Sequence, residues 1–250
     1  MNLRFFSRLV VTAVAFLMGI SGPLSAAPTS KANVAFENGI EAYRTGDIAT
    51  AVTDWTTASA GGHPLASYLL GELYDQGRGV ERSPSLAFHY YERAADEGQA
   101  VAGVKVGLIY RDGDKSLGIK KNYDKAIKYF EKGALQAWPP SQYYLADMYR
   151  RGLGVPVERS EALRWLLLAA KKKYSPAMVE IAKIHFEGES VLVDRVKGWS
   201  FVELASRFAD PEQGKQVNAA MDKYSKRMKS GEKEAAQSEA DKWAAEFIAQ

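Results

Sequence analysis

Apolar and small residues recur along most of this chain at the three- and four-residue spacing of amphipathic helices, in paired segments separated by glycine turns. The stretch from Leu65 to Gly98 shows the unit, with one helical segment, a turn at Gly77, a second helical segment and a closing turn. Four other segments repeat this skeleton. The pattern therefore predicts an all-α protein built from about five helix-turn-helix repeats.

The repeats align in register on several columns of residues. A small residue opens each second helix at intervals of 36, 39, 36 and 36 residues: Ala51, Ala87, Ala126, Ala162 and Gly198. A large residue follows four positions later, at Trp55, Tyr91, Phe130, Leu166 and Val202. Four positions before the opening residue stands a helix-capping type, at Asp47, Ser83, Asn122 and Asp194, with Glu158 as the exception. A repeat of this length predicts a solenoid, in which every hairpin completes its core against its neighbours.

The first helices carry a small residue followed three positions later by an aromatic ring, and both are predicted to pack against neighbouring helices. The small residues are Gly71, Gly107, Ala146 and Ala182, and the rings are Tyr74, Tyr110, Tyr149 and His185. Three extra residues between Gly113 and Ala126 predict a longer loop in the third repeat. Beyond Asp210-Pro211, a predicted N-cap and first position, a helix from Glu212 to Lys229 and a last helix after Gly231 are predicted to close the core.

These signals predict the following organisation of the chain: a signal peptide at 1–26, a first repeat at 33–63, further repeats at 64–99, 100–139 with the longer loop, 140–175 and a degenerate one at 176–210, and C-terminal capping helices at 211–250.

The N-terminal segment has the three parts of a Sec-type signal peptide. Arg4 and Arg8 precede a short apolar core at 9–20, and Gly22-Pro23 then leads to small residues, with cleavage expected after Ala26 or Ala27. The alternative is an uncleaved anchor, but the apolar core is shorter than the roughly 20 residues that span a bilayer. We therefore expect a periplasmic protein with no stable membrane insertion after cleavage.

Composition offers little support for other classes of function. The chain has no cysteine, and its net charge of +3 includes the two leader arginines, so nucleic-acid binding has no compositional basis. His63, His89 and His185 stand in separate repeats, and no motif indicates a metal, a cofactor or a catalytic group. The glycine pairs beginning at Gly77 and Gly152 follow helices rather than strands, so they are interpreted as turns rather than phosphate loops.

The repeat resembles a known motif. The pattern A-x-x-x-L-G-x-L-Y-x-x-G-x-G-V followed by A-x-x-Y/W-x-x-x-A-A stands at 66–80 with 87–95. It stands again at 141–155 with 162–170, where Ser141, Ala146 and Met148 replace the first Ala, the first Gly and the second Leu. It resembles the Sel-one-like repeat (SLR), a longer-looped relative of the tetratricopeptide repeat, and the first copy is more similar to the tetratricopeptide repeat itself. The resemblance implies a right-handed α-solenoid whose first helices line the concave face, and protein–protein interaction as the usual role.

A concave face of this kind would take three positions from each first helix. These candidate partner-binding residues are Tyr68, Glu72 and Asp75; Val104, Leu108 and Arg111; Tyr143, Asp147 and Arg150; and Val179, Lys183 and Phe186. Their mixture of aromatic, apolar and charged side chains suits a peptide or protein partner.

The leading hypothesis is an exported, non-catalytic scaffold that binds a periplasmic or envelope protein, with a signalling regulator as one form. An alternative is a hydrolase or binder of β-lactams or peptidoglycan fragments. The SLR branch linked to that activity has a disulfide within each helix pair, which this chain does not have. A second alternative is a structural or oligomerisation element.

Overall fold

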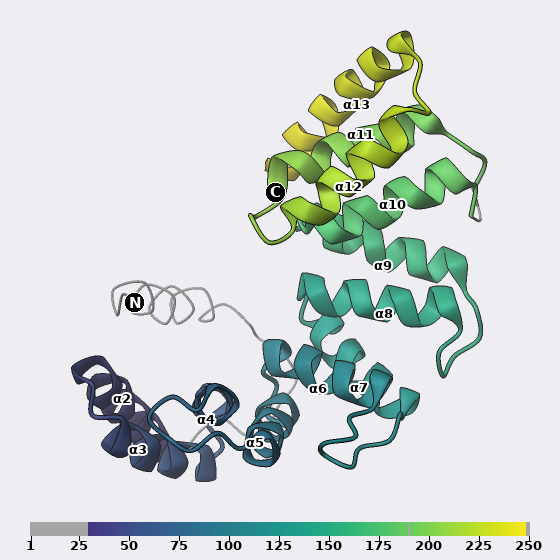
Figure 1. Ribbon diagram of the computed structural model, residues 1–250. Coiled ribbons are helices and arrows are strands. Elements are labelled where there is room, and N and C mark those ends of the chain that lie inside the picture. The colour runs from purple at the N-terminus through teal and green to yellow at the C-terminus, as the bar shows by residue number, and fades with distance from the viewer. Residues whose placement is uncertain (1–29, 190, 249–250) are drawn as a thin grey trace. The chain divides into compact units, whose positions relative to one another are not determined.

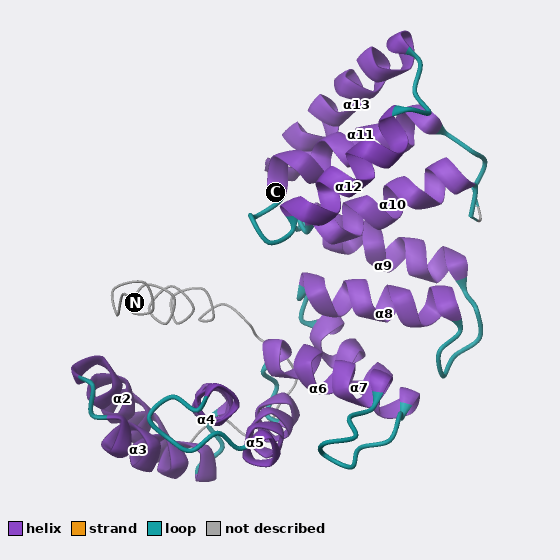
Figure 2. Cartoon of the chain, viewed as in Figure 1, coloured by secondary structure: helices purple, strands orange, loops and turns teal. Residues whose placement is uncertain are grey.

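The computed structural model describes residues 30–189 and 191–248, so the predicted signal peptide at 1–26 lies outside the described residues. Within that part of the chain every regular element is an α-helix, and the only β-type pairing is an isolated bridge between Asp114 and Ile119 (Figure 2). No helix in the described ranges is long and apolar enough to cross a membrane. The prediction of an all-α protein is confirmed.

The chain divides between Asn122 and Tyr123 into two compact units, here called unit 1 and unit 2. Unit 1 contains α2 (Ser30–Thr45), α3 (Ile48–Ala60), α4 (Pro64–Gln76), α5 (Pro84–Asp96) and α6 (Ala100–Asp112). Unit 2 contains α7 (Tyr123–Leu135), α8 (Pro139–Arg151), α9 (Arg159–Lys171), α10 (Ser175–Glu187), α11 (Arg195–Phe208), α12 (Gly214–Ser225) and α13 (Ser230–Ile248) (Figure 1). The boundary falls between the two helices of the predicted third repeat.

Hairpins stack within each unit as the repeat pattern predicts. In unit 1, α2 packs on α3 and α4 on α5, and α3 packs in turn on α4. In unit 2, α8 packs on α9 and α10 on α11, with α9 against α10. The alanines that open the second helices are all buried, at 0% exposure for Ala51 and Ala126, 1% for Ala162 and 3% for Ala87. The equivalence of these positions is therefore confirmed.

The capping column behaves as its residue types dictate. Asp47, Ser83 and Asp194 each precede a second helix, and their side chains accept a hydrogen bond from the backbone N–H three residues later. Glu158, the exception in the sequence, precedes α9 without a side-chain cap. The sequence departure and the missing cap therefore coincide.

The two units match small residues to large ones in different ways. In unit 1, Gly71 lies so close to Tyr91 that a Cβ atom at Gly71 would stand 2.6 Å from two ring carbons, and Gly39 is crowded in the same way by Trp55. In unit 2 the same columns hold the pairs Ala146 with Leu166 and Ala182 with Val202, all buried in one core cluster. Glycine is thus paired with an aromatic ring and alanine with an aliphatic side chain.

The extra residues of the third repeat form a short, self-bonded loop. The backbones of Asp114 and Ile119 exchange two hydrogen bonds of 2.8 Å, and the Asp114 carboxylate accepts from the backbone N–H groups of Ser116 and Leu117. This is the arrangement of an Asx turn, in which the aspartate side chain replaces a missing backbone partner. The insertion is accommodated locally.

The C-terminal segment differs from the predicted pair of helices in its bounds and its packing. Asp210 accepts from the backbone N–H groups of Glu212 and Gln213, as an N-cap would, but a turn follows it and α12 runs only from Gly214 to Ser225. The two helices do not form a hairpin, because α13 packs on α11 whereas α12 packs on α10 and α11. Each therefore covers a separate part of the last repeat.

Candidate interaction surface

The sequence-predicted residues lie on the first helices of the hairpins, on α4 and α6 in unit 1 and on α8 and α10 in unit 2. We call the predicted residues of α4 and α6, together with Lys105, the first-helix face of unit 1. The predicted residues of α8 and α10, together with Tyr144 and Glu180, are the first-helix face of unit 2. The two faces are described separately below.

In unit 1, Tyr91 of the second helix α5 contacts two acidic residues of the first-helix face. The Tyr91 ring is buried between α4 and α5, and its hydroxyl donates to Glu72 Oε1 at 2.7 Å and lies 3.3 Å from Asp75 Oδ2. Lys105 of α6 places its Nζ 3.0 Å from the same Glu72 oxygen and 4.8 Å from the centre of the Tyr91 ring. The carboxylate of Glu72 thus has both a hydroxyl and an ammonium donor.

These contacts shift the titration of the cluster. Burial alone raises the pKa of Glu72, but the hydrogen bonds from Tyr91 and Lys105 outweigh it and hold the pKa below 4.5. Burial, with the Glu72 carboxylate beside it, raises the pKa of both Tyr68 and Tyr91. Glu72 is therefore a carboxylate at neutral pH and both tyrosines keep their protons.

The other α6 residues of the unit 1 face are apolar or, in the case of Arg111, already in an ion pair. Val104 and Leu108 are half-buried, and Arg111 forms a bidentate ion pair with its neighbour Asp112, with nitrogen–oxygen distances of 2.9 and 2.7 Å. The charged side chains of the unit 1 face therefore already have partners within the chain.

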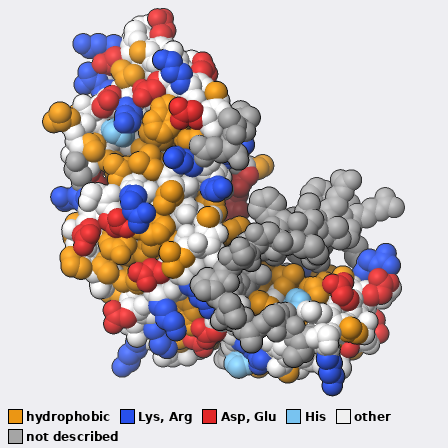
Figure 3. Space-filling model, turned by 180° about the vertical axis from the view of Figure 1, so that it is seen from behind, with side chains coloured by type: hydrophobic (Ala, Val, Ile, Leu, Met, Phe, Trp, Pro, Cys, Tyr) orange, Lys and Arg blue, Asp and Glu red, His pale blue; other side chains and the backbone are white. Residues whose placement is uncertain are grey.

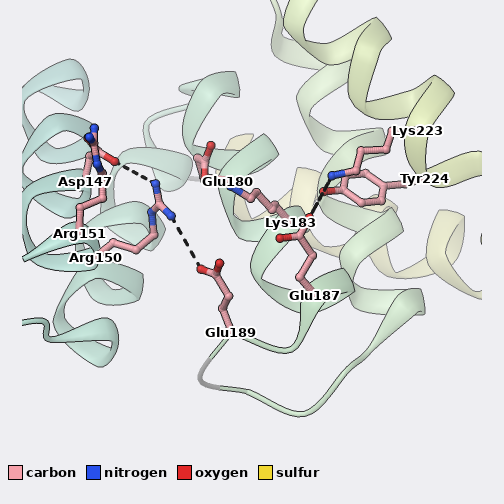
Figure 4. Close-up of polar contacts among 9 residues, drawn as sticks. All are labelled: Asp147, Arg150, Arg151, Glu180, Lys183, Glu187, Glu189, Lys223 and Tyr224. Atoms are coloured by element: carbon pink, nitrogen blue, oxygen red, sulfur yellow. Dashed lines mark hydrogen bonds and ion pairs between the residues drawn. The ribbon is translucent and has the colours of Figure 1, made fainter.

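In unit 2, α8 places Tyr143, Asp147 and Arg150 in one row. Asp147 accepts from Arg150 at 3.0 Å and from Arg151 at 3.1 Å, and Arg150 also lies 3.9 Å from Glu189. Figure 4 shows Asp147, Arg150 and Arg151 beside the side chains of α10. Burial and the nearby carboxylates of Glu180 and Asp147 raise the pKa of Tyr143 to about 12, so its hydroxyl remains protonated.

The next carboxylate along, Glu180 of α10, lacks the donors that Glu72 has. Its Oε2 atom is buried and has no hydrogen-bond partner among the described residues. The nearest cation of its own helix, Lys183 Nζ, stands 4.0 Å away, which is an ion-pair distance but too long for a hydrogen bond. Burial lowers the pKa of Arg150, whereas the negative charges of Glu180 and Asp147 raise it, and the net shift is upward. Glu180 therefore lies near cations, but its buried Oε2 atom accepts no hydrogen bond from the described residues.

Two of the twelve predicted residues are not on a surface, and here the prediction is corrected. Phe186 is fully buried and Val179 is 8% exposed. The Phe186 ring stacks on Tyr224 of α12 with centroids 4.2 Å apart, so α12 lies where a partner was expected. Lys223 and Tyr224 also bind Glu187, at 2.9 and 3.3 Å, and Arg227 donates to the Phe186 carbonyl at 2.7 Å.

The remaining ten predicted residues are at least partly exposed, and the structure adds residues that the sequence did not single out. These are Tyr91, predicted only as core, and Lys105, Glu180 and Glu187. The alignment of the repeats contains part of this signal, because the position of Lys105 in α6 is occupied by Glu180 in α10. On the face of unit 2 drawn in Figure 3, apolar, basic and acidic side chains are interspersed.

No group of three or more His, Asp or Glu side chains among the described residues is placed to hold a metal ion. Tandem helical hairpins of near-constant length, stacked edge to edge, define the class of α-solenoid repeat proteins. The family model described as the Sel1 repeat matches residues 64–99, 102–137, 139–174 and 175–207, which is more than half of the sequence. The chain belongs to the Sel1 repeat family, whose members are generally protein–protein interaction scaffolds.

Known proteins support the same assignment. The chain is similar to an exopolysaccharide production negative regulator of Rhizobium leguminosarum bv. viciae, with 26% identity over 61% of each chain. It is similar in structure to a Sel1 repeat protein from Oxalobacter formigenes (TM-score 0.61, 26% identity, 78% of this chain and 86% of that one). A protective antigen of uropathogenic Escherichia coli shares the SLR fold (TM-score 0.71, 23% identity, 86% of this chain and 46% of that one). The matches span only 12 to 61% of the first curated relatives.

Proposed function

We propose that this chain is an exported, non-catalytic scaffold of the cell envelope that binds another protein through its first-helix faces, in the role of a signalling regulator. The observation that carries the proposal is the unit 2 face, where Tyr143, Arg150 and Glu180 gather partly exposed rings and charges that their own chain does not fully pair. Tyrosine and arginine are the side chains that contribute most at protein interfaces.

Export and regulation rest on separate support. Export rests on the leader at 1–26, and purified periplasmic protein is expected to begin after Ala26 or Ala27 by mass spectrometry. The regulatory role rests on the similarity to a negative regulator of exopolysaccharide production. A cytoplasmic protein that retains the leader would contradict the location and leave the binding face unaffected.

The binding face is tested by affinity capture from the envelope fraction. We expect the double variant Tyr143→Ala with Arg150→Ala to lose the captured protein while helical content and melting temperature stay near wild type. The matched control is Glu161→Ala with Arg164→Ala, which removes an exposed ion pair on the second helix α9. If the first-helix variant still captures the partner, or the α9 variant loses it equally, the proposed face is wrong.

A further inference from the structure

The first-helix faces of the two units differ at one matched pair of positions. In unit 1, Lys105 of α6 reaches back to Glu72 of α4 at 3.0 Å. The repeat columns align Glu72 with Asp147 and Lys105 with Glu180 when the pair α4 and α6 is replaced by α8 and α10. Where unit 1 sets a cation against a carboxylate, unit 2 therefore sets two carboxylates.

The hydroxyl that supports the unit 1 pair is also replaced. Tyr91 donates to Glu72 from beneath, whereas the same column in the α8–α9 hairpin holds Leu166, which has no hydrogen-bonding group. Asp147 takes its donors from Arg150 and Arg151 of its own helix. Among the described residues Glu180 Oε2 accepts no hydrogen bond, and its ion pair is with Lys183 Nζ at 4.0 Å. An acceptor buried without a donor costs about 1–3 kcal/mol. The Glu180 side chain is still 20% exposed, so a donor from a partner can approach its carboxylate.

At the C-terminal end of α10, basic side chains of α12 contact an acidic and an aromatic residue. Glu187 lies seven residues after Glu180, two helical turns along the same side. There the chain's own α12 places the Lys223 ammonium 2.9 Å from the Glu187 carboxylate, and the Arg227 guanidinium lies 5.3 Å from the centre of the Phe186 ring. Figure 4 shows the contact between Lys223 and Glu187, and it shows Glu180 near Lys183, whose Nζ lies 4.0 Å from Glu180 Oε2.

The aromatic ring next to Glu180 is that of Tyr143, which belongs to a group of three tyrosines. The Tyr143 ring lies 5.2 Å from Tyr144 and 5.8 Å from Tyr174, and both contacts are edge-to-face. Tyrosine rings beside a carboxylate favour a cation, and above all the planar guanidinium of arginine, which can stack and donate two hydrogen bonds at once.

We propose that the protein partner inserts an arginine or lysine side chain against Glu180, beside Tyr143, and so supplies to unit 2 the cation that Lys105 supplies in unit 1. The proposal rests on the proposed function and names the partner's contact residue. Its occupant is a basic side chain of a polypeptide, and the partner segment next to it is expected to be rich in basic residues.

The probe is a random peptide library displayed on phage and selected on the immobilised full chain. Selected peptides are expected to carry a conserved Arg or Lys, and their Kd should rise about tenfold with Glu180→Gln, the size expected when one charged hydrogen bond is lost. Glu180→Lys recreates the unit 1 pair with Asp147, so it should abolish binding while the melting temperature is kept or raised. Glu161→Gln on α9 is the matched control and should leave the Kd unchanged.

The outcomes separate the two proposals. Peptides that need Tyr143 and Arg150 but bind equally well to Glu180→Gln, or that carry no basic residue, would overturn the contact at Glu180 and leave the binding face intact. Peptides that no first-helix substitution displaces, or a selection that yields no binder, would overturn both. Circular dichroism of each variant ensures that a lost contact is not a lost fold.

Discussion

The two first-helix faces start from the same repeat and reach opposite electrostatic states. On unit 1, Glu72 accepts from Tyr91 and Lys105, so the charges of the face are paired inside the chain. On unit 2, the aligned positions hold Asp147, Leu166 and Glu180, and the buried Oε2 atom of Glu180 accepts no hydrogen bond from the described residues. A repeat scaffold can therefore keep one core while individual columns decide whether a face is closed on itself or open to a partner.

The largest expected effect concerns the end of the unit 2 face that α12 covers. Phe186→Ala removes a fully buried ring stacked on Tyr224, and we expect the free energy of unfolding to fall by about 3–5 kcal/mol in urea titration. Arg150→Ala, at the same column of α8, should change it by less than about 1 kcal/mol, because an exposed or half-buried ion pair contributes little. Equal losses at the two positions would mean that α12 does not make this end of the face part of the core.

Tyr91→Phe tests whether the unit 1 face is held closed from beneath. The change deletes the hydroxyl that donates to Glu72 and should cost about 1.5–3 kcal/mol, the range for hydrogen bonds to charged groups. Tyr90→Phe is the matched control on the same helix, since that ring packs on Tyr74 and no hydrogen bond from its hydroxyl links α4 and α5. The result that contradicts the closed-face description is an equal cost for both variants.

The same variant has a consequence at acid pH. The folded-state pKa of Glu72 lies below 4.5, so its contribution to stability is present above pH 4.5 and is lost as the pH falls through the folded-state value. Removing the Tyr91 hydroxyl takes away one of the contacts that lower that pKa. The loss of stability between pH 6 and the acid limb should therefore be shallower in Tyr91→Phe than in wild type.

Much of the fold could be predicted because the repeat period reports directly on burial. The alanine column, the caps at Asp47, Ser83 and Asp194 and the Glu158 exception each recur at a fixed position of the repeat. The burial of Val179 and Phe186 could not be predicted in this way. It depends on the position at which α12 packs, and α12 begins nearly thirty residues after Phe186. The repeat period carries no information about that position. The hydrogen bond from Tyr91 to Glu72 could not be predicted either. A column of large residues predicts a buried ring, but it does not predict the partner of the ring's hydroxyl.

One buried or half-buried histidine in each unit is expected to make the free energy of unfolding depend on pH, with a smaller effect than the substitutions above. His185 in α10 is 6% exposed, and burial with the nearby Lys197 lowers its pKa below 6.5, Asp194 opposing. Burial lowers the pKa of His63 in unit 1, where Nδ1 accepts from the Ala66 N–H. Their neutral forms stabilise the fold fully above pH 6.5, and this stability is lost as the pH falls through the folded-state values.

His185→Tyr and His63→Asn separate these two contributions. Tyrosine is the residue of the same column in α4, α6 and α8, and asparagine keeps an N-cap acceptor before α4. Each variant should flatten the slope of unfolding free energy between pH 7 and pH 5, as measured by urea titration at several pH values. The slope is the measured quantity, so a uniform change in stability does not affect the result. An unchanged slope in both variants would show that neither ring titrates with folding.

The smallest expected effect decides what holds α12 on the unit 2 face. Lys223 binds Glu187 at 2.9 Å, but its side chain is 57% exposed, and ion pairs of that kind contribute less than about 1 kcal/mol and weaken in salt. Tyr224 beside it is 2% exposed and stacks on Phe186. Lys223→Ala should therefore lower the unfolding free energy by a few tenths of a kcal/mol at low salt and not measurably at 1 M NaCl, whereas Tyr224→Ala should lower it by about 3–5 kcal/mol at both. A large, salt-sensitive loss in Lys223→Ala would assign the docking of α12 to charge rather than to the buried ring, and it would make the cap, like the Glu180 contact, responsive to ionic strength.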